Sequence, residues 1–418
     1  MSLYATAAPG PGRASGAGWC KEMGGRHGSA TNLRAVELAA DSSVVQPTCL
    51  EPTLPDYGGA CLSEVVPALY RRRELAEAGE LPAWLPTVVA EARQVVLLVL
   101  DGLGWRQLTE RRRLAPTLSA MSGGPITSVA PTTTATALTS IATGCAPARH
   151  GIIGYRLATP RGILNVLRWT AGGKDARASV PPERLRRAEA FCGHRPPVIT
   201  RAEFAGSGFT EAHLHGVPLV GWRAPSSISV EIARALRGGA ELVYAYYDGI
   251  DKIAHEYGLH EHYDAELTAA DRLVADAIEA LVPGAALLVT ADHGQVEVAR
   301  QPVVLDEDLV CEVALLSGEG RFRWLHARPG RDGALLAACR ERYSSIAWVR
   351  HREELVAENW FGGELAPEVA ALLGDVALVA SAPVAFYDPA DSGELRLISR
   401  HGSLTADEVL VPLLAAAA

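Results

Sequence analysis

The chain has 418 residues, of which 48% are hydrophobic, so it can form one large α/β domain or two ordinary domains with a sizeable core. A formal net charge of −9 argues against a nucleic-acid or anionic-membrane surface, although metal ions would still allow an anionic substrate. No apolar run reaches the ~20 residues of a membrane helix, and seven scattered cysteines favour a reduced, cytoplasmic protein.

The first part of the chain differs in composition from the rest. Residues 1–55 are rich in Gly, Ala, Ser and Pro and lack sustained periodicity, which predicts a loosely ordered N-terminal arm. We expect one ordered domain over residues 56–418.

Three short apolar runs rich in Val and Leu predict central strands: QVVLLVL at 94–100, ELVYAYY at 241–247 and AALLVT at 285–290. Acidic residues follow each run, namely Asp101, Asp251 and Asp292. Sites in open α/β sheets form beyond the carboxyl ends of such strands, so we expect these carboxylates at one edge.

The remaining segments surround these strands. Apolar residues recur at helical spacing over 263–281, which predicts a crossover helix. The less regular ranges 155–240 and 296–380 are interpreted as insertions that form a small cap over the site. Near the end, a strand-like run precedes His401, and the pattern Thr405-Ala406-Asp407-Glu408 predicts the start of a helix.

Carboxylates and imidazoles near the strand ends favour a metal site. The candidate ligands are Asp101, Asp251, His255, Asp292, His293 and His401. Catalytic zinc commonly has three protein ligands and an open position, so six ligands divide into two sites. Two metal ions roughly 4 Å apart suit phosphoryl transfer, and mixed carboxylate and imidazole ligands favour Zn²⁺.

Each candidate also has an ordinary explanation. An Asp-Gly pair after a strand, as at Asp101, is usually a turn, and Asp251 with His255 one helical turn later is often surface polarity. His401 alone would carry no functional meaning. The joint occurrence of these residues at predicted strand ends makes the metal interpretation the stronger one.

Five segments in this order carry a resemblance to a known family: VVLLVLDGLGW, APTTTATALTSIATGCAPARHGI, DGIDKIAHEYG, VTADHG and RHGSLT, over residues 95–405. They resemble the alkaline phosphatase superfamily, most closely its nucleotide pyrophosphatase/phosphodiesterase branch. The resemblance implies a three-layer α/β fold with a central, largely parallel mixed sheet and a small inserted cap. It implies one metal ion held by Asp251, His255 and His401. It implies a second ion held by Asp101, Asp292, His293 and the oxygen of the nucleophile.

The nucleophile follows from the pattern P-T-x-T-x-x-N of that branch. Aligned without gaps, it places the nucleophile at Thr134, where a helical segment begins and free N–H groups favour a phosphate. The neighbouring threonines are interpreted as turn, cap or packing residues. The chain departs from the pattern at Ala137, where the branch has an Asn that donates to a phosphoryl oxygen.

A second motif lies in the same segment. Cys145-Ala146-Pro147-Ala148-Arg149 matches the C-x-P-x-R maturation pattern of sulfatases. In sulfatases this pattern precedes the T-G pair, whereas here it follows Thr143-Gly144. We interpret the match as a coincidence and Cys145 as a small buried residue.

We therefore expect a metal-dependent phosphoric ester hydrolase acting on a small-molecule phosphate ester or nucleotide through a phosphothreonine at Thr134. No basic residue adjoins Thr134, which favours a diester or pyrophosphate over a doubly charged monoester. The more distant basic candidates are Arg149, Arg156, Arg168 and Lys252, with Trp169 as a wall for an aromatic leaving group. The alternatives are a phosphomonoesterase, a phosphonate hydrolase, a cofactor-independent mutase, a sulfatase and a non-catalytic binding protein that retains the fold.

Overall fold

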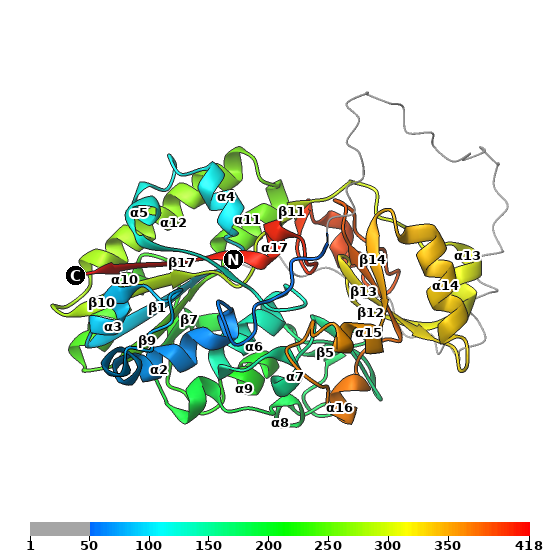
Figure 1. The fold of residues 1–418 in the computed structure, drawn as a ribbon, viewed down its shortest axis with the longest axis horizontal. Helices are drawn as coiled ribbons and strands as arrows, with labels where there is room; N and C mark the ends of the chain where they lie inside the picture. The colour runs from blue at the N-terminus through cyan, green and yellow to red at the C-terminus, as the bar shows by residue number, and fades with distance from the viewer. Residues whose placement is uncertain (1–50) are drawn as a thin grey trace. The chain divides into compact units, whose positions relative to one another are not determined.

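A seven-stranded sheet forms the centre of the computed structural model, which describes residues 51–418 (Figure 1). From one edge to the other its strands are β2 (Ser122–Thr127), β17 (Leu410–Ala417), β10 (Ala285–Thr290), β1 (Gln94–Leu100), β9 (Leu242–Tyr247), β7 (Val198–Arg201) and β8 (Leu219–Trp222). The strands from β10 to β8 run parallel, and β17 is antiparallel to both its neighbours. The largely parallel mixed sheet is therefore confirmed.

The three strands expected from the apolar runs lie at the middle of this sheet. β1 pairs with β10 on one side and β9 on the other. Its residues from Val95 to Leu100 are fully buried, because both faces of the strand are covered. A strand buried on both faces has no polar alternation, which is why a continuous apolar run predicted it.

Helices cover both faces of the sheet and make the fold three-layered (Figure 1). One layer contains α2 (Leu62–Ala78), α3 (Thr87–Glu91), α6 (Thr134–Thr143) and α9 (Gly208–His213). The other contains α4 (Trp105–Glu110), α5 (Pro116–Ala120), α10 (Ser227–Arg237), α11 (Gly249–Tyr257) and α12 (Glu261–Glu279). α12 is the predicted crossover helix, and its buried positions include Leu267, Ala270, Val274 and Ala277.

Two antiparallel sheets of four strands each lie outside the central one. The first consists of β3 (Arg156–Thr159), β4 (Gly162–Asn165), β5 (Thr170–Ala171) and β6 (Lys174–Asp175). The second has the order β12 (Val313–Glu319), β13 (Phe322–Ala327), β15 (Val376–Ala380) and β14 (Ala347–His351). The helices near these sheets are α7 (Pro147–His150), α8 (Pro182–Leu185), α13 (Glu307–Glu312), α14 (Asp332–Tyr343), α15 (Arg352–Ala357) and α16 (Pro367–Ala370).

The range 155–240, interpreted above as a cap insertion, contains parts of two different sheets. Its first part forms the β3–β6 sheet, whereas residues 198–237 supply β7, β8 and α10 to the central layers. These strands have four residues each, too few for periodicity to reveal them. The range 296–380 provides all four strands of the second small sheet.

The segments at the two ends of the chain were predicted to be a loosely ordered arm and a helix. Residues 1–50 of the predicted arm lie outside the described residues, while Thr53 N donates a 2.8 Å hydrogen bond to Leu404 O. The helix expected after Thr405 is a single turn, α17 (Ala406–Val409), before the chain enters β17. Within residues 51–418, no helix combines the length and apolarity needed to cross a membrane.

Candidate active site

The carboxylates expected beyond the strand ends meet at one edge of the sheet. Asp101 follows β1, Asp292 follows β10, and Asp251 lies in the first turn of α11, just after β9. Asp251 N donates a 3.1 Å hydrogen bond to Asp101 O, so the ends of neighbouring strands are joined directly. The parallel register therefore creates the predicted cluster of acids.

One group of potential metal ligands consists of Asp101, Asp292 and His293, whose ligand atoms all lie within 4.8 Å of one another. His293 Nε2 is 3.5 Å from Asp101 Oδ1 and 3.4 Å from Asp292 Oδ2. Both of these oxygens are buried without a hydrogen-bond partner among the described residues. The other oxygens are held in place: Tyr246 donates to Asp101 Oδ2, and Gly102 N donates to Asp292 Oδ1 at 3.0 Å.

A second group consists of Asp251, His293 and His401, again with ligand atoms within 4.8 Å of one another. His255 adjoins it, with Nε2 3.3 Å from Asp251 Oδ1. Thr132 O lies 2.7 Å from His401 Nδ1, and Ser399 O lies 2.7 Å from His255 Nδ1. A carbonyl can only accept, so each Nδ1 donates and each Nε2 keeps the lone pair that a metal needs. His293 lies within reach of both groups.

Thr134 is the first residue of α6 and lies beside these groups. Its side-chain oxygen is 3.2 Å from His293 Nε2, and the residue is 8% exposed. The other threonines of the helix bond to the backbone: Thr136 Oγ1 accepts from Gly154 N, and Thr139 Oγ1 donates to Ala135 O. Thr134 thus differs from these threonines in pointing to the cluster.

Burial shapes the electrostatics of the cluster. Burial, with the neighbouring Asp292 and Asp251 carboxylates, raises the pKa of Asp101 well above its usual value, and burial also raises the pKa of Asp292. Burial lowers the pKa of His401 well below its usual value, and the neighbouring His293 and His255 lower it further. Crowded buried carboxylates beside imidazoles, with oxygen atoms lacking donors, are a donor set that fits a divalent cation.

The remaining sequence candidates lie in other surroundings. Arg156 is buried and paired with Asp388 at 2.5 Å and with Asp391 at 3.3 Å. Lys252 pairs with Asp248 at the N-terminus of α11. Ala137 is fully buried within α6 and offers no donor. Arg156 is therefore held by the carboxylates of its own surroundings.

Two further sequence motifs have structural roles. Cys145 follows α6 at its C-terminal end, about 15 Å from Thr134 by the length of a ten-residue helix. Its thiol contacts Thr143 O at 3.5 Å. His150 is buried with Nε2 2.8 Å from Ser140 Oγ, and burial lowers its pKa to about 3.

Two residues of the site were missed by sequence reasoning. Gln295 Nε2 donates to Asp251 Oδ1 at 2.6 Å, and Tyr246 donates to Asp101. A polar residue directly after Asp292-His293-Gly294 was a signal for Gln295. Tyr246 belongs to an apolar strand and gave no such signal.

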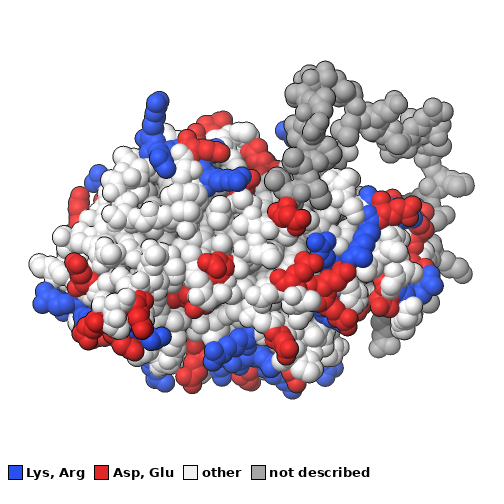
Figure 2. Space-filling view, in the orientation of Figure 1, with Lys and Arg blue, Asp and Glu red and all other residues white. Residues whose placement is uncertain are grey.

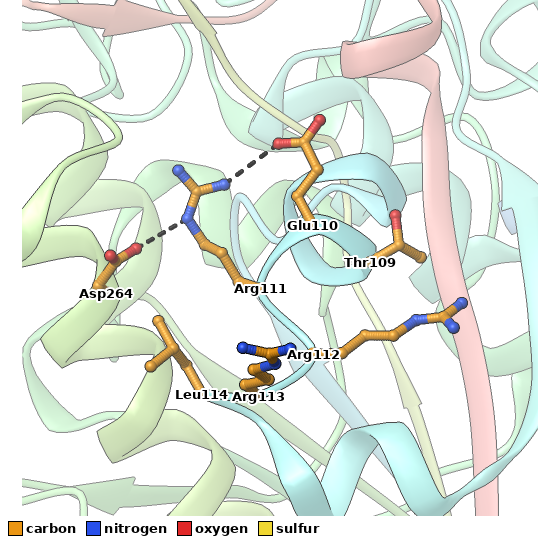
Figure 3. A pocket seen from close by; sticks show the side chains of 7 residues that line it. All are labelled: Thr109, Glu110, Arg111, Arg112, Arg113, Leu114 and Asp264. Carbon is orange, nitrogen blue, oxygen red and sulfur yellow. Dashed lines mark hydrogen bonds and ion pairs between the residues drawn. The ribbon is translucent and has the colours of Figure 1, made fainter.

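A surface hollow of about 580 Å³ is lined by residues outside the ligand cluster (Figure 3). Its lining residues are Thr109, Glu110, Arg111, Arg112, Arg113, Leu114 and Asp264. Arg111 lies across it, with Nε 2.8 Å from Asp264 Oδ1 and Nη1 3.4 Å from Glu110. It shares no residue with the cluster, so we assign it no catalytic role.

Comparisons with known proteins agree with the fold. The family model of type I phosphodiesterase / nucleotide pyrophosphatase matches residues 95–404. Murine ectonucleotide pyrophosphatase / phosphodiesterase 5 is structurally similar, with a TM-score of 0.59 at 16% identity over 77% of this chain and 87% of that chain. Phosphonoacetate hydrolase from Sinorhizobium meliloti, in complex with phosphonoformate, has a TM-score of 0.55 at 20% identity over 78% and 90%. The same murine protein also has a solved structure of an inactive threonine-to-alanine variant in complex with AMP, at 15% identity, a TM-score of 0.58 and 77% and 87% coverage. No curated protein sequence matches the chain.

Proposed function

This chain belongs to the type I phosphodiesterase / nucleotide pyrophosphatase family, and from that premise we propose that it hydrolyses phosphoric esters through Thr134 with two divalent metal ions. Hydrolysis of phosphoric ester bonds is the activity of the family. The observation that carries the finer proposal is the position of Thr134 Oγ1, at a helix N-terminus and 3.2 Å from a histidine shared by both ligand groups. The inactive threonine-to-alanine variant of the murine protein, solved with AMP, supports it.

The proposed ligand sets follow the two groups. Asp251, His255 and His401 would hold one ion, and Asp101, Asp292, His293 and Thr134 the other. When bound, the ions supply Lewis-acid stabilisation of charge on phosphoryl oxygens and lower the pKa of coordinated hydroxyls. Zinc suits this mixture of carboxylate and imidazole.

The reaction proceeds in two displacements. Thr134 Oγ1 forms a bond to phosphorus while the bond from phosphorus to the leaving oxygen breaks. The N–H groups at the start of α6 face the phosphoryl oxygens and stabilise their charge. Water then attacks the phosphothreonine, and the bond between phosphorus and Oγ1 breaks to restore the free hydroxyl.

The substrate is proposed to be a small phosphate ester or nucleotide, not a nucleic-acid polymer. Basic and acidic side chains are interspersed over the face shown in Figure 2, without the continuous basic surface that a polyanion requires. The murine relative was solved with AMP and the bacterial one with phosphonoformate, both small molecules. A cytoplasmic location remains our proposal from the scattered cysteines.

We expect the protein, purified without chelator, to contain about two zinc ions per chain and to lose activity when they are removed. The reason is that the buried carboxylates of the cluster need a cation to balance them. Elemental analysis and activity before and after chelation and zinc addition measure this. Magnesium alone, or one ion in fully active protein, would contradict the two-zinc centre.

We expect bis(p-nitrophenyl) phosphate to be hydrolysed with a higher kcat/KM than p-nitrophenyl phosphate at matched pH and metal. A monoester carries nearly one more negative charge than a diester and needs more positive charge around its oxygens. Arg156 is held by two aspartates, and Lys252 by Asp248. A monoester preference of ten-fold, ~1.4 kcal/mol in transition-state free energy, would overturn the diester assignment in favour of a phosphomonoesterase.

A further inference from the structure

Gln295 is a buried amide in direct contact with a proposed metal ligand. It is 1% exposed, and its Nε2 donates to Asp251 Oδ1 at 2.6 Å. Its Oε1 has no hydrogen-bond partner within residues 51–418. The amide is therefore oriented by the carboxylate of Asp251, because the reverse orientation would place two acceptors against each other.

The oxygen that accepts this hydrogen bond is the one that faces the histidines. Asp251 Oδ1 lies 3.3 Å from His255 Nε2 and 3.8 Å from His401 Nε2. A carboxylate oxygen has two lone pairs, so the amide occupies one and leaves the other directed toward the imidazoles. The hydrogen bond thus fixes the rotation of the Asp251 carboxylate without blocking its ligand position.

Gln295 is itself held rigidly. Gln107 Nε2 donates to Gln295 O at 2.7 Å, which ties the backbone at this position to α4. β11 (Val296–Glu297) pairs antiparallel with β16 (Ser399–Arg400), so Gln295 and His401 leave the same two-stranded ladder side by side. The pairing of β11 with β16 therefore sets the position of the Gln295 amide relative to the His401 ring.

The loop after β1 packs closely against Asp251 and Gln295. Gly102 has φ +77°, and a Cβ there would lie 2.9 Å from Asp251 Cα and 3.0 Å from Gln295 Nε2. The close approach of the loop after β1 thus encloses both side chains. This confinement makes a single rotamer of the amide the favoured state.

We propose that Gln295 is a positioning residue of the metal centre, which orients Asp251 to bind the ion shared with His255 and His401. The inference rests on the proposed metal centre. Partners that orient metal ligands from outside the coordination sphere typically contribute 10–100-fold to metal affinity or activity. A buried glutamine with a merely structural role would change stability but not the affinity of one particular ion.

The test is the pair of zinc dissociation constants of the full chain, measured by competition with a chromophoric chelator. Gln295→Met keeps the length and apolar volume of the side chain but cannot donate. We expect the dissociation constant of one ion to rise about ten-fold or more and that of the other to change less than about three-fold. If Gln295→Met fails to fold, Gln295→Asn, which is too short to reach Asp251, serves instead.

Gln94→Met is the matched control. Gln94 Nε2 also donates hydrogen bonds, at 2.8 Å to Ala240 O and 2.9 Å to Leu236 O. Gln94 lies at the start of β1, whereas the ligand cluster lies beyond its other end. This variant should keep both zinc dissociation constants of the unmodified protein. Unfolding midpoints of the metal-free proteins show whether the two substitutions disturb the fold equally.

A double-mutant cycle with Asp251→Ala, which removes the acceptor oxygen, assigns the effect. If Gln295 acts through Asp251, Gln295→Met should cause little further loss of zinc affinity in the Asp251→Ala background. Unchanged affinities in Gln295→Met, or equal weakening of both ions, would overturn the proposed role while leaving the two-ion centre intact. Absence of bound zinc in the unmodified protein would instead contradict the proposed function.

Discussion

Thr134→Ala should lower kcat for phosphate diester hydrolysis by about 10³-fold or more, because the variant lacks the oxygen that bonds to phosphorus. The methyl side chain of alanine still fits the start of α6, so the fold should persist. The other proposed ligands of the same ion, Asp101, Asp292 and His293, are unchanged in this variant. Measurement of kcat together with zinc content separates loss of the nucleophile from loss of metal.

The matched control for this variant is Thr139→Ala in the same helix. Thr139 Oγ1 donates to Ala135 O at 2.6 Å and does not approach the ligand cluster. Deleting it should leave kcat near that of the unmodified protein. The assignment would be wrong if Thr134→Ala kept near-normal activity while Thr132→Ala or Cys145→Ala abolished it.

Arg321→Leu should destabilise the protein by about 3–5 kcal/mol, the typical cost of leaving one partner of a buried ion pair uncompensated. Arg321 and Glu408 are both fully buried and form a bidentate pair, with Nε and Nη2 each 2.8 Å from a carboxylate oxygen. Arg321 directly precedes β13 of the second small sheet, and Glu408 lies in α17, so the pair joins that sheet to α17. Urea unfolding of the metal-free protein measures the effect.

The same substitution should also weaken zinc binding, since Glu408 holds the loop that carries His401. Glu408 Oε1 accepts from Ser403 N at 2.9 Å, and Thr132 Oγ1 donates to Ser403 O at 2.7 Å. Thr132 O in turn accepts from the His401 ring. Loss of Arg321 therefore disturbs the loop on which this ligand depends.

Arg331→Leu is the control, because it breaks an exposed ion pair of the same bidentate geometry as the buried pair of Arg321 and Glu408. Arg331 and Glu312 also form a bidentate pair, but their side chains are 52% and 29% exposed. An exposed pair contributes about 0–1 kcal/mol. Equal losses of stability in Arg321→Leu and Arg331→Leu would contradict the structural role of the buried pair.

The elements that sequence reasoning could predict are those whose burial leaves a local pattern. β1 and β10 are buried on both faces and appear as continuous apolar runs, while α12 buries one face and shows helical periodicity. The α/β class and the approximate place of the acids follow from these patterns. The resemblance added the three-layer arrangement, Thr134 and the proposed grouping of the ligands, which no local pattern supplied.

The elements that could not be predicted depend on contacts between distant residues. β7 and β8 have four residues each and are recognisable as strands only through their parallel pairing. Gln295 reaches Asp251 across 44 positions, and Arg321 reaches Glu408 across 87. His401 joins the other candidate ligands because β16 pairs with β11. Such contacts leave no periodic trace in the sequence.

The stereochemical course at phosphorus tests the two-step reaction most directly. Each in-line displacement inverts the configuration at phosphorus. Attack by Thr134 followed by attack by water therefore predicts overall retention when a chiral phosphorothioate diester is hydrolysed in isotopically labelled water. Overall inversion would contradict the account, because it would show that water attacks the substrate in a single step without a phosphothreonine.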